Sequence, residues 1–166
     1  MARIDSTPDV IFPLLVARLI NQVSGLDASS CFLSLDPDEI PGATSGDYVV
    51  VVSPSPQFRF DQSIFTGAEE YGAMATWHAA ITIHSTANID EPGRDTEFLA
   101  SQALGVTAKA TQVAKAILGF DPVDGNGNYV LAQPIQPSDG AIDRPTRSQG
   151  SIQFGVEITF VWDLIS

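Results

Sequence analysis

The sequence SIQFGVEITFVWDL, residues 151–164, decides the fold because its side chains alternate between apolar and polar. Its large apolar side chains occupy every second position: Ile152, Phe154, Val156, Ile158, Phe160, Trp162 and Leu164. Alternation with a period of two is typical of a β-strand with one buried face and one exposed face. Burial of these side chains, at about 1.5–3 kcal/mol each, gives an upper limit of about 10–20 kcal/mol. The stretch therefore predicts a central strand of the main sheet.

The same strand is long for a chain of 166 residues. At about 3.3 Å per residue it spans about 46 Å, whereas a compact chain of this length has a diameter near about 40 Å. Either Gly155 marks a bulge that bends the strand, or one end of the strand projects beyond the body. A projecting end exposes unpaired backbone groups that favour a partner strand. The length is thus a first indication that the protein works in an assembly.

Shorter strands are predicted at 31–35, 47–52, 57–60 and 76–85. The last of these, TWHAAITIHS, alternates again and is the natural antiparallel neighbour of the terminal strand. The segment 47–52, DYVVVV, is rich in β-branched residues and fits a strand buried on both faces. The sequence Ser53-Pro54-Ser55-Pro56 is expected to end it, because proline cannot donate to a sheet ladder.

Two helices are predicted. Thr7-Pro8-Asp9 is a helix start, with a run to about residue 23 and a kink or delay at Pro13. A long helix is predicted over 95–118, with apolar residues at three- and four-residue spacing and Gly119 just past its end. These elements predict an α+β fold in which both helices pack on the apolar face of one antiparallel or mixed sheet. Trp162 and Ile158 should then lie between the sheet and the long helix.

The length favours one α+β domain over residues 1–166, with long loops at about 53–75 and 120–150. The second loop carries several Gly and Pro turns and only one strand-like stretch, YVLAQPIQ. Irregular segments of this length are uncommon in compact domains and are often binding loops.

The net charge of −12 and the pI of about 4.2 argue against specific nucleic-acid binding and against an anionic membrane surface. The N-terminus shows no basic stretch followed by an apolar core, so we expect no signal peptide and no membrane anchor. The only cysteine, Cys31, lies in the apolar run CFLSL and is expected to be a buried, inert thiol.

Candidate catalytic and metal sites are weak. His78 and His84 are six residues apart on one predicted strand, so they lie about 20 Å apart and cannot share an ion. The sequence from Asp124 to Asn128 begins like a calcium loop but lacks the required glycine and glutamate, and it fits a tight Asn126-Gly127 turn. The sequence contains neither a nucleophile elbow nor a phosphate-binding loop. We therefore expect no catalytic residue, no metal, no cofactor and no enzymatic activity.

Four aromatic residues lie among acids and glycines outside any long predicted strand: Phe58, Phe60, Phe65 and Tyr71. They either pack against their own loop or form a contact between subunits, since exposed aromatic residues are frequent interface anchors.

The order of these elements resembles the tail terminator, or tail-completion, proteins of long-tailed bacteriophages. The resemblance covers most of the chain and rests on the N-terminal helix, DYVVVV at 47–52, TWHAAITIHS at 76–85, the alanine-rich helix at 95–118 and QFGVEITFVW at 153–162. It implies a virion protein assembled in the host cytoplasm, whose subunits form a ring, usually a hexamer. Such a ring caps the tail tube, contacts the neck or head-completion protein, and lets DNA pass through without specific binding.

Acidic charge agrees with that implication, because an acidic lumen lets a polyanion slide. Related neck and head–tail joining proteins share similar folds and remain an alternative. Two further classes stay open: a small α+β enzyme such as a hot-dog-like thioesterase, and a ligand-binding module of the same fold type.

Overall fold

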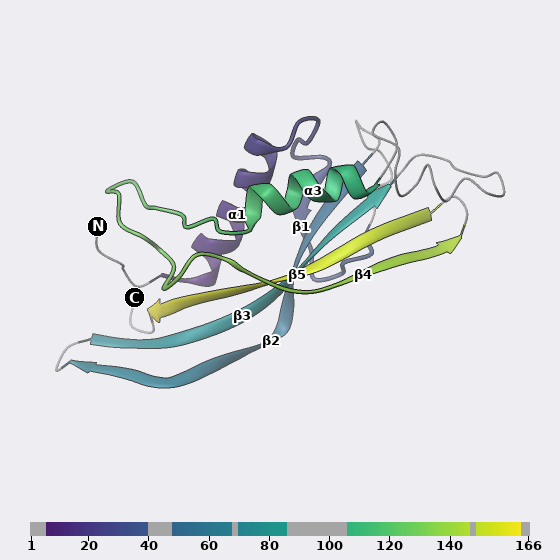
Figure 1. Cartoon of the computed structure of the whole chain (residues 1–166). Coiled ribbons are helices and arrows are strands. Elements are labelled where there is room, and N and C mark those ends of the chain that lie inside the picture. The colour runs from purple at the N-terminus through teal and green to yellow at the C-terminus, as the bar shows by residue number, and fades with distance from the viewer. Residues whose placement is uncertain (1–5, 40–47, 68–69, 86–105, 147–148, 164–166) are drawn as a thin grey trace.

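The computed structural model describes residues 6–39, 48–67, 70–85, 106–146 and 149–163. Within the strands it describes the backbone alone for 61–67, 70–72, 85, 141–146, 149–150 and 163. The described chain has the predicted α+β fold, with α1 (Pro8–Gln22) and α3 (Val106–Ile117) on one face of a mixed five-stranded sheet (Figure 1).

The strands are β1 (Cys31–Leu33), β2 (Tyr48–Gly67), β3 (Glu70–Ser85), β4 (Gln136–Thr146) and β5 (Gln149–Asp163). Their order in the sheet is β1-β2-β3-β5-β4, with β1 parallel to β2 and every other pair antiparallel. The terminal strand β5 therefore lies inside the sheet, and β3 is its antiparallel neighbour, so both sequence predictions are confirmed.

The core lies between the sheet and the two helices. Fully buried side chains from the sheet and from both helices meet there, including Leu15, Leu19, Ile81, Ile83, Val113, Ile117, Ile158 and Phe160. The alternating positions of β5 explain this arrangement, because a period of two sends every second side chain to the helix-covered face.

The start of α1 and the end of α3 follow local sequence signals. Helix α1 begins at Pro8 with Thr7 in an extended conformation, and it continues through Pro13 without a break, so the predicted delay is wrong. Gly119 follows α3 with a φ of +77°, as expected for a residue just past a helix end. The predicted start of the long helix at 95 lies outside the described residues.

The predicted loop at 53–75 is wrong. Strand β2 continues through Pro54 and Pro56 to Gly67, and β3 returns from Glu70, so the predicted strand at 57–60 is only a part of β2. Two register shifts in the pairing with β3 absorb extra residues of β2. Prolines are tolerated here because the outer edge of β2 forms no backbone hydrogen bonds to another described strand beyond its short pairing with β1, so the missing N–H of proline removes none.

The predicted loop at 120–150 is correct only as far as residue 135. Strand β4 occupies 136–146, although its sequence QPSDGAIDRPT lacks alternation, and β5 begins at Gln149. In the remaining loop the tight turn at Asn126-Gly127 is confirmed, with Gly127 at a φ of +82° and the Asp124 amide donating to Asn128 O at 2.8 Å. Backbone amides of Asn128 and Asn126 donate to the Asp124 carboxylate and lower its pKa.

Gly155 does not bulge. Pairing between β3 and β5 runs without a register shift, and the irregularity lies on β4, between Pro137 and Gly140. A Cβ atom on Gly155 would collide with the Ser138 hydroxyl, so glycine at 155 leaves room for the bulge of its neighbour. The projecting element is the hairpin of β2 and β3, which extends beyond the helices in Figure 1.

Candidate functional site

Aromatic side chains from α1, β2, β3 and β5 meet where the hairpin leaves the body. We call this set the aromatic cluster: Phe12, Phe58, Phe60, Trp77, Phe160 and Trp162. Phe58 stacks on Trp77 with ring centroids 4.5 Å apart, and Trp77 lies 5.7 Å from Trp162. The indole Nε1 of Trp77 donates to Ser55 O at 2.8 Å, which ties the bulged part of β2 to β3.

Register explains why these residues share one face. Phe58 lies opposite Trp77, and Trp77 lies opposite Ile158, whose side chain is buried under the helices. Trp162 is only partly buried and packs in the aromatic cluster, so the prediction that it lies under the long helix is wrong, whereas the burial of Ile158 is confirmed.

The outer members of the aromatic cluster remain exposed. Phe58 is 40% exposed and Phe60 is 46% exposed, although both contact other rings of the chain. The two residues thus pack against other strands rather than against their own loop, and they still present apolar surface to solvent. Backbone pairing places Phe65 and Tyr71 in the hairpin. The structure describes only the backbone of these two residues.

An apolar groove of about 510 Å³ continues this surface toward α1 and the end of β1. Its lining includes Phe12, Leu33, Leu35, Pro54 and Trp77. Leu35 is 80% exposed, and sequence reasoning missed it because the strand predicted at 31–35 includes it, whereas β1 ends at Leu33. Contiguous exposed apolar surface of this kind is typical of protein–protein contacts.

The outer edge of β2 adjoins the same surface. Strand β1 covers that edge from Val50 to Val52, and the Ser34 amide adds one more bond to Val52 O. In the part of the chain that the structure describes, no strand pairs with this edge beyond Val52. An uncovered edge of an extended hairpin is a template for another strand.

The opposite face of the sheet is less exposed than the alternation predicts. Val49, Val51, Thr82 and His84 are buried there, and the His84 Nε2 lies 2.7 Å from Pro37 O, so the segment around Pro37 covers this face. A cavity of about 480 Å³ lies beside that segment, with Ser53 and His78 in its lining. The Ser53 hydroxyl has no hydrogen-bond partner among the described residues.

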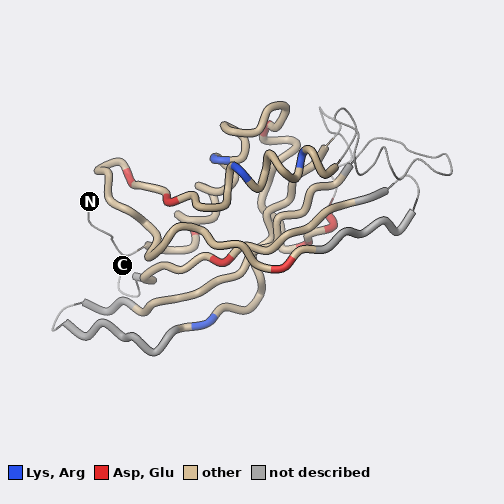
Figure 2. Tube along the Cα trace, in the orientation of Figure 1, with Lys and Arg blue, Asp and Glu red and all other residues tan. Residues whose placement is uncertain are grey.

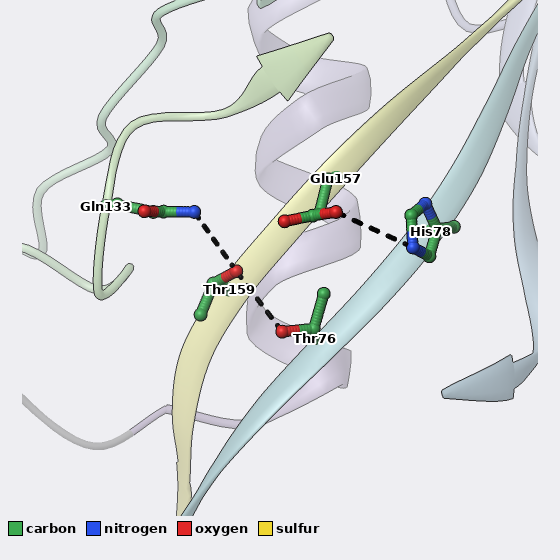
Figure 3. A network of polar contacts seen from close by, with 5 residues as sticks. All are labelled: Thr76, His78, Gln133, Glu157 and Thr159. Carbon is green, nitrogen blue, oxygen red and sulfur yellow. Dashed lines mark hydrogen bonds and ion pairs between the residues drawn. The ribbon is translucent and has the colours of Figure 1, made fainter. Parts of the chain in front are cut away.

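Figure 3 shows the polar contacts on this face. The Gln133 Nε2 donates to Thr159 Oγ1 at 3.3 Å, and the hydroxyls of Thr159 and Thr76 are 3.4 Å apart. His78 Nε2 lies 3.7 Å from Glu157 Oε2. The two histidines thus have separate partners, and within the described ranges no three His, Cys, Asp or Glu side chains form a group able to hold a metal.

Cys31 is buried, as predicted, and is 1% exposed. Burial raises the pKa of its thiol to about 12, which keeps it in the unreactive thiol form near neutral pH.

No helix among the described residues is both long enough and apolar enough to span a bilayer.

Charged side chains are unevenly placed among the described residues (Figure 2). Arg18, Lys109 and Lys115 lie on the two helices, whereas Asp139 and Glu157 lie on β4 and β5. The Lys109 Nζ donates to Ser24 O at 3.0 Å and lies over the Tyr48 ring; its partial desolvation lowers its pKa. This lysine therefore links α3 to the turn after α1 and to β2.

No protein-family model matches the sequence, and no curated protein matches it. Among solved structures, a chain described as "Virion of native gene transfer agent (GTA) particle" is 16% identical, with a TM-score of 0.42. The match covers 92% of this chain and 87% of that chain.

Proposed function

We propose that this chain is a structural virion protein, the tail terminator of a long-tailed bacteriophage, and that it has no enzymatic activity. The observation that carries the proposal is the projecting β2–β3 hairpin, whose Phe58 and Phe60 are 40% and 46% exposed beside the uncovered edge of β2. An arm with exposed aromatic side chains and unpaired backbone suits self-assembly better than it suits an isolated subunit.

The proposed assembly is a closed hexameric ring held by head-to-tail contacts. Heterologous contacts produce rings when the rotation between neighbours closes. The edge of β2 would add to a neighbouring subunit by strand addition, and the exposed rings of the aromatic cluster would fill the contact. The hairpin provides the backbone bonds, and Phe58 and Phe60 provide the apolar area.

The ring would cap the tail tube and join it to the neck or head-completion protein in the virion. A net charge of −12 per chain favours an acidic lumen, through which DNA slides without specific binding. The irregular segment at 120–135, which contains the exposed Val123, is the surface we propose for the tube or neck.

The test uses phage particles assembled with variant subunits. Phe60→Asp places a charge in the proposed contact, so electron microscopy should show tails of irregular length and heads without tails. Val10→Asp is the matched control, because Val10 is 46% exposed on α1 and the substitution introduces the same charge away from the hairpin and from the segment at 120–135. Normal tail length and normal head joining with Phe60→Asp would falsify the proposed contact, and a basic lumen in the assembled ring would remove the argument for sliding DNA.

A further inference from the structure

Two edges of the five-stranded sheet have no partner strand in the part of the chain that the structure describes. The outer edge of β2 is uncovered where its pairing with β1 ends at Val52, and β4 lies at the opposite end of the sheet (Figure 1). Between these two edges the strands β2, β3, β5 and β4 are antiparallel throughout. Both edges therefore present backbone groups to an approaching strand.

The direction of the backbone groups on β2 follows from its bonds to the neighbouring segment. Val50 donates its N–H to Ser30 O, and Val52 O accepts from the Ser34 amide. In an antiparallel ladder the direction alternates from one residue to the next. Residues 50 and 52 thus point outward, and Val51 between them points to β3.

Phe58 and Phe60 have the same outward direction. Between Pro54 and Phe58, four residues of β2 correspond to two of β3, so the alternation resumes unchanged after the shift. Strand β3 keeps its own alternation, because its pairing with β5 has no shift. Pro54 points outward too but lacks an N–H. The ladder is regular again at 58–60, where Phe58 and Phe60 can donate outward bonds.

The outward positions of β4 follow from the direction of β5. Thr159 O accepts from the Ala132 amide, so odd-numbered residues of β5 point away from β3 and toward β4. Ala141 lies opposite an odd-numbered residue of β5 and bonds to it, so Gly140 and Ile142 on either side point outward. Register shifts bound this stretch on both sides, as they bound 58–60 on β2. Each edge therefore offers one short regular stretch with two outward residues.

Strand directions allow these two edges to meet. Strand β2 is antiparallel to β3, whereas β4 runs parallel to it, so a second copy with the same strand direction places its β2 antiparallel to β4 of the first. Phe58 lies opposite Trp77 and Gly140 lies opposite Phe154, and both partners pack against the core, so the helices of the two copies stay on one face. Pairing of β2 with β2 about a two-fold axis would instead close a dimer.

We propose that residues 58–60 of β2 pair with residues 140–142 of β4 in a second copy. The strands are antiparallel, with Phe58 opposite Ile142 and Phe60 opposite Gly140. Each of these two pairs exchanges its N–H and C=O groups, as the hydrogen-bonded pairs of an antiparallel ladder do. This inference rests on the proposed ring and deepens it by naming the strand that receives the edge of the hairpin.

The register produces an offset that suits a closed sheet. Within one copy, Ala141 lies level with Thr82 of β3, whereas Arg59 lies level with Thr76, six residues away. Neighbouring copies are therefore offset by about 20 Å along the strands, at about 3.3 Å per residue, across four strands that span about 19 Å. These lengths correspond to a strand tilt of about 45°, at the upper end of the range of roughly 35–45° in closed sheets.

The same register leaves the pairing of β1 intact. With the six-residue offset, the end of β4 at Thr146 comes level with Ser53 of the second copy. Strand β1 covers the edge of that copy only as far as Val52. The two strands thus lie end to end along one edge and do not compete for it.

Disulfide formation tests the register. In the proposed pair Arg59 lies opposite Ala141, with Cα atoms about 4.5 Å apart, a separation that a disulfide can bridge. One full-length copy carries Arg59→Cys, and a second copy, lengthened by a tag, carries Ala141→Cys; the native Cys31 is only 1% exposed. Under mild oxidation this mixed dimer should form at least about tenfold faster than one of Arg59→Cys with Val10→Cys, because pairing raises the local thiol concentration.

Proline at an outward position tests the backbone bonds. Ile142→Pro in the Ala141→Cys copy removes an outward N–H without removing a bond to β5, so the preference should be lost. Ile142→Ala is the matched control; it shortens the side chain, keeps the N–H and should retain the preference. A further comparison needs no proline: Asp143→Cys, two residues along the same face, should cross-link to Arg59→Cys more slowly than Ala141→Cys does.

Equal rates for the Ala141→Cys and Val10→Cys partners overturn the proposal. Dimers of Arg59→Cys copies alone that form as fast as the mixed dimer also overturn it, because they mean that two β2 edges pair with each other. Electron microscopy of the unmodified chain separates this failure from that of the ring. Rings without the Ala141→Cys preference mean that another contact closes the ring. A clear preference without any ring on particles means that the strand contact exists and that the tail-terminator assignment is wrong.

Discussion

Gly155 shows at the scale of one residue how β5 accepts an irregular neighbour. The pairing of β4 with β5 shifts between Pro137 and Gly140, and the bulged residues pass directly over Gly155. A side chain at 155 would meet Ser138 and the Asp139 carbonyl oxygen, the latter at 3.3 Å. Glycine is needed here for close approach and not for its backbone freedom.

Gly155→Ala should therefore lower the free energy of unfolding by about 1–3 kcal/mol through overpacking. The double variant Ser138→Ala with Gly155→Ala should recover most of the loss, because it removes the colliding hydroxyl. Gly125→Ala is the control, since its added Cβ would meet nothing within 4 Å. Urea denaturation measures all three, and an unchanged Gly155→Ala variant would contradict the close approach.

Adjacent residues of β5 test which face is the core. Ile158 is 0% exposed under the helices, so Ile158→Ala should cost about 2–5 kcal/mol. Thr159 is also buried, at 7% exposed, but its contacts are long hydrogen bonds to Gln133 and Thr76. Thr159→Val, which keeps the shape, should cost about 1 kcal/mol. Equal losses in chemical denaturation would show that the faces are assigned wrongly.

Strand β2 is the element that gives the molecule its shape. Near its start, its side chains Val50 and Val52 are buried in the core. The strand then bulges where Trp77 donates a hydrogen bond to Ser55 O, and it continues as one arm of the hairpin. The prolines at 54 and 56 do not stop it, because its outer edge has no continuing partner strand in the described chain. The uncovered edge and the exposed aromatic residues are therefore consequences of one strand leaving the core.

Trp77→Phe should loosen the root of this hairpin. The substitution keeps an aromatic ring in the cluster but removes the 2.8 Å hydrogen bond to Ser55 O, at a cost of about 0.5–1.5 kcal/mol. Amide hydrogen exchange of Gln57 to Phe60 should become faster, because that bond holds the bulge against β3. Trp162→Phe, in the same cluster, is the control, and equal effects of the two variants would contradict a role for the indole bond.

The whole molecule combines a net charge of −12 with the exposed apolar surface of the aromatic cluster. A net charge of −12 opposes the approach of identical subunits, whereas the exposed rings of the aromatic cluster favour it. The balance between the two depends on ionic strength, because salt screens the long-range repulsion and leaves apolar contacts intact.

Self-association should therefore strengthen as salt is added. The Debye length falls from about 30 Å at 0.01 M to about 8 Å at 0.15 M ionic strength, so repulsion between neighbouring subunits decreases over this range. Light scattering at fixed protein concentration should show a larger mean mass at the higher salt. A mean mass that decreases with salt would mean that ion pairs dominate the contact.

Local patterns in the sequence by themselves determined the α+β class, the central strand β5, its neighbour β3, the start of α1 and the glycine that follows α3. These features depend on residues a few positions apart, whose periodicity is visible without knowledge of the rest of the chain. The candidate aromatic residues Phe58 and Phe60 were found for the same reason, since they stand among acids and glycines.

Only the tertiary structure decided where those aromatic residues lie and what they contact. Phe58 meets Trp77 and Trp162 because β2, β3 and β5 are paired in one register, and that register joins segments far apart in the chain. The same holds for β4, whose irregular sequence becomes a strand only because β5 offers an edge with glycine at 155. Edge position and long-range pairing are properties of the folded sheet, so no local period could reveal them.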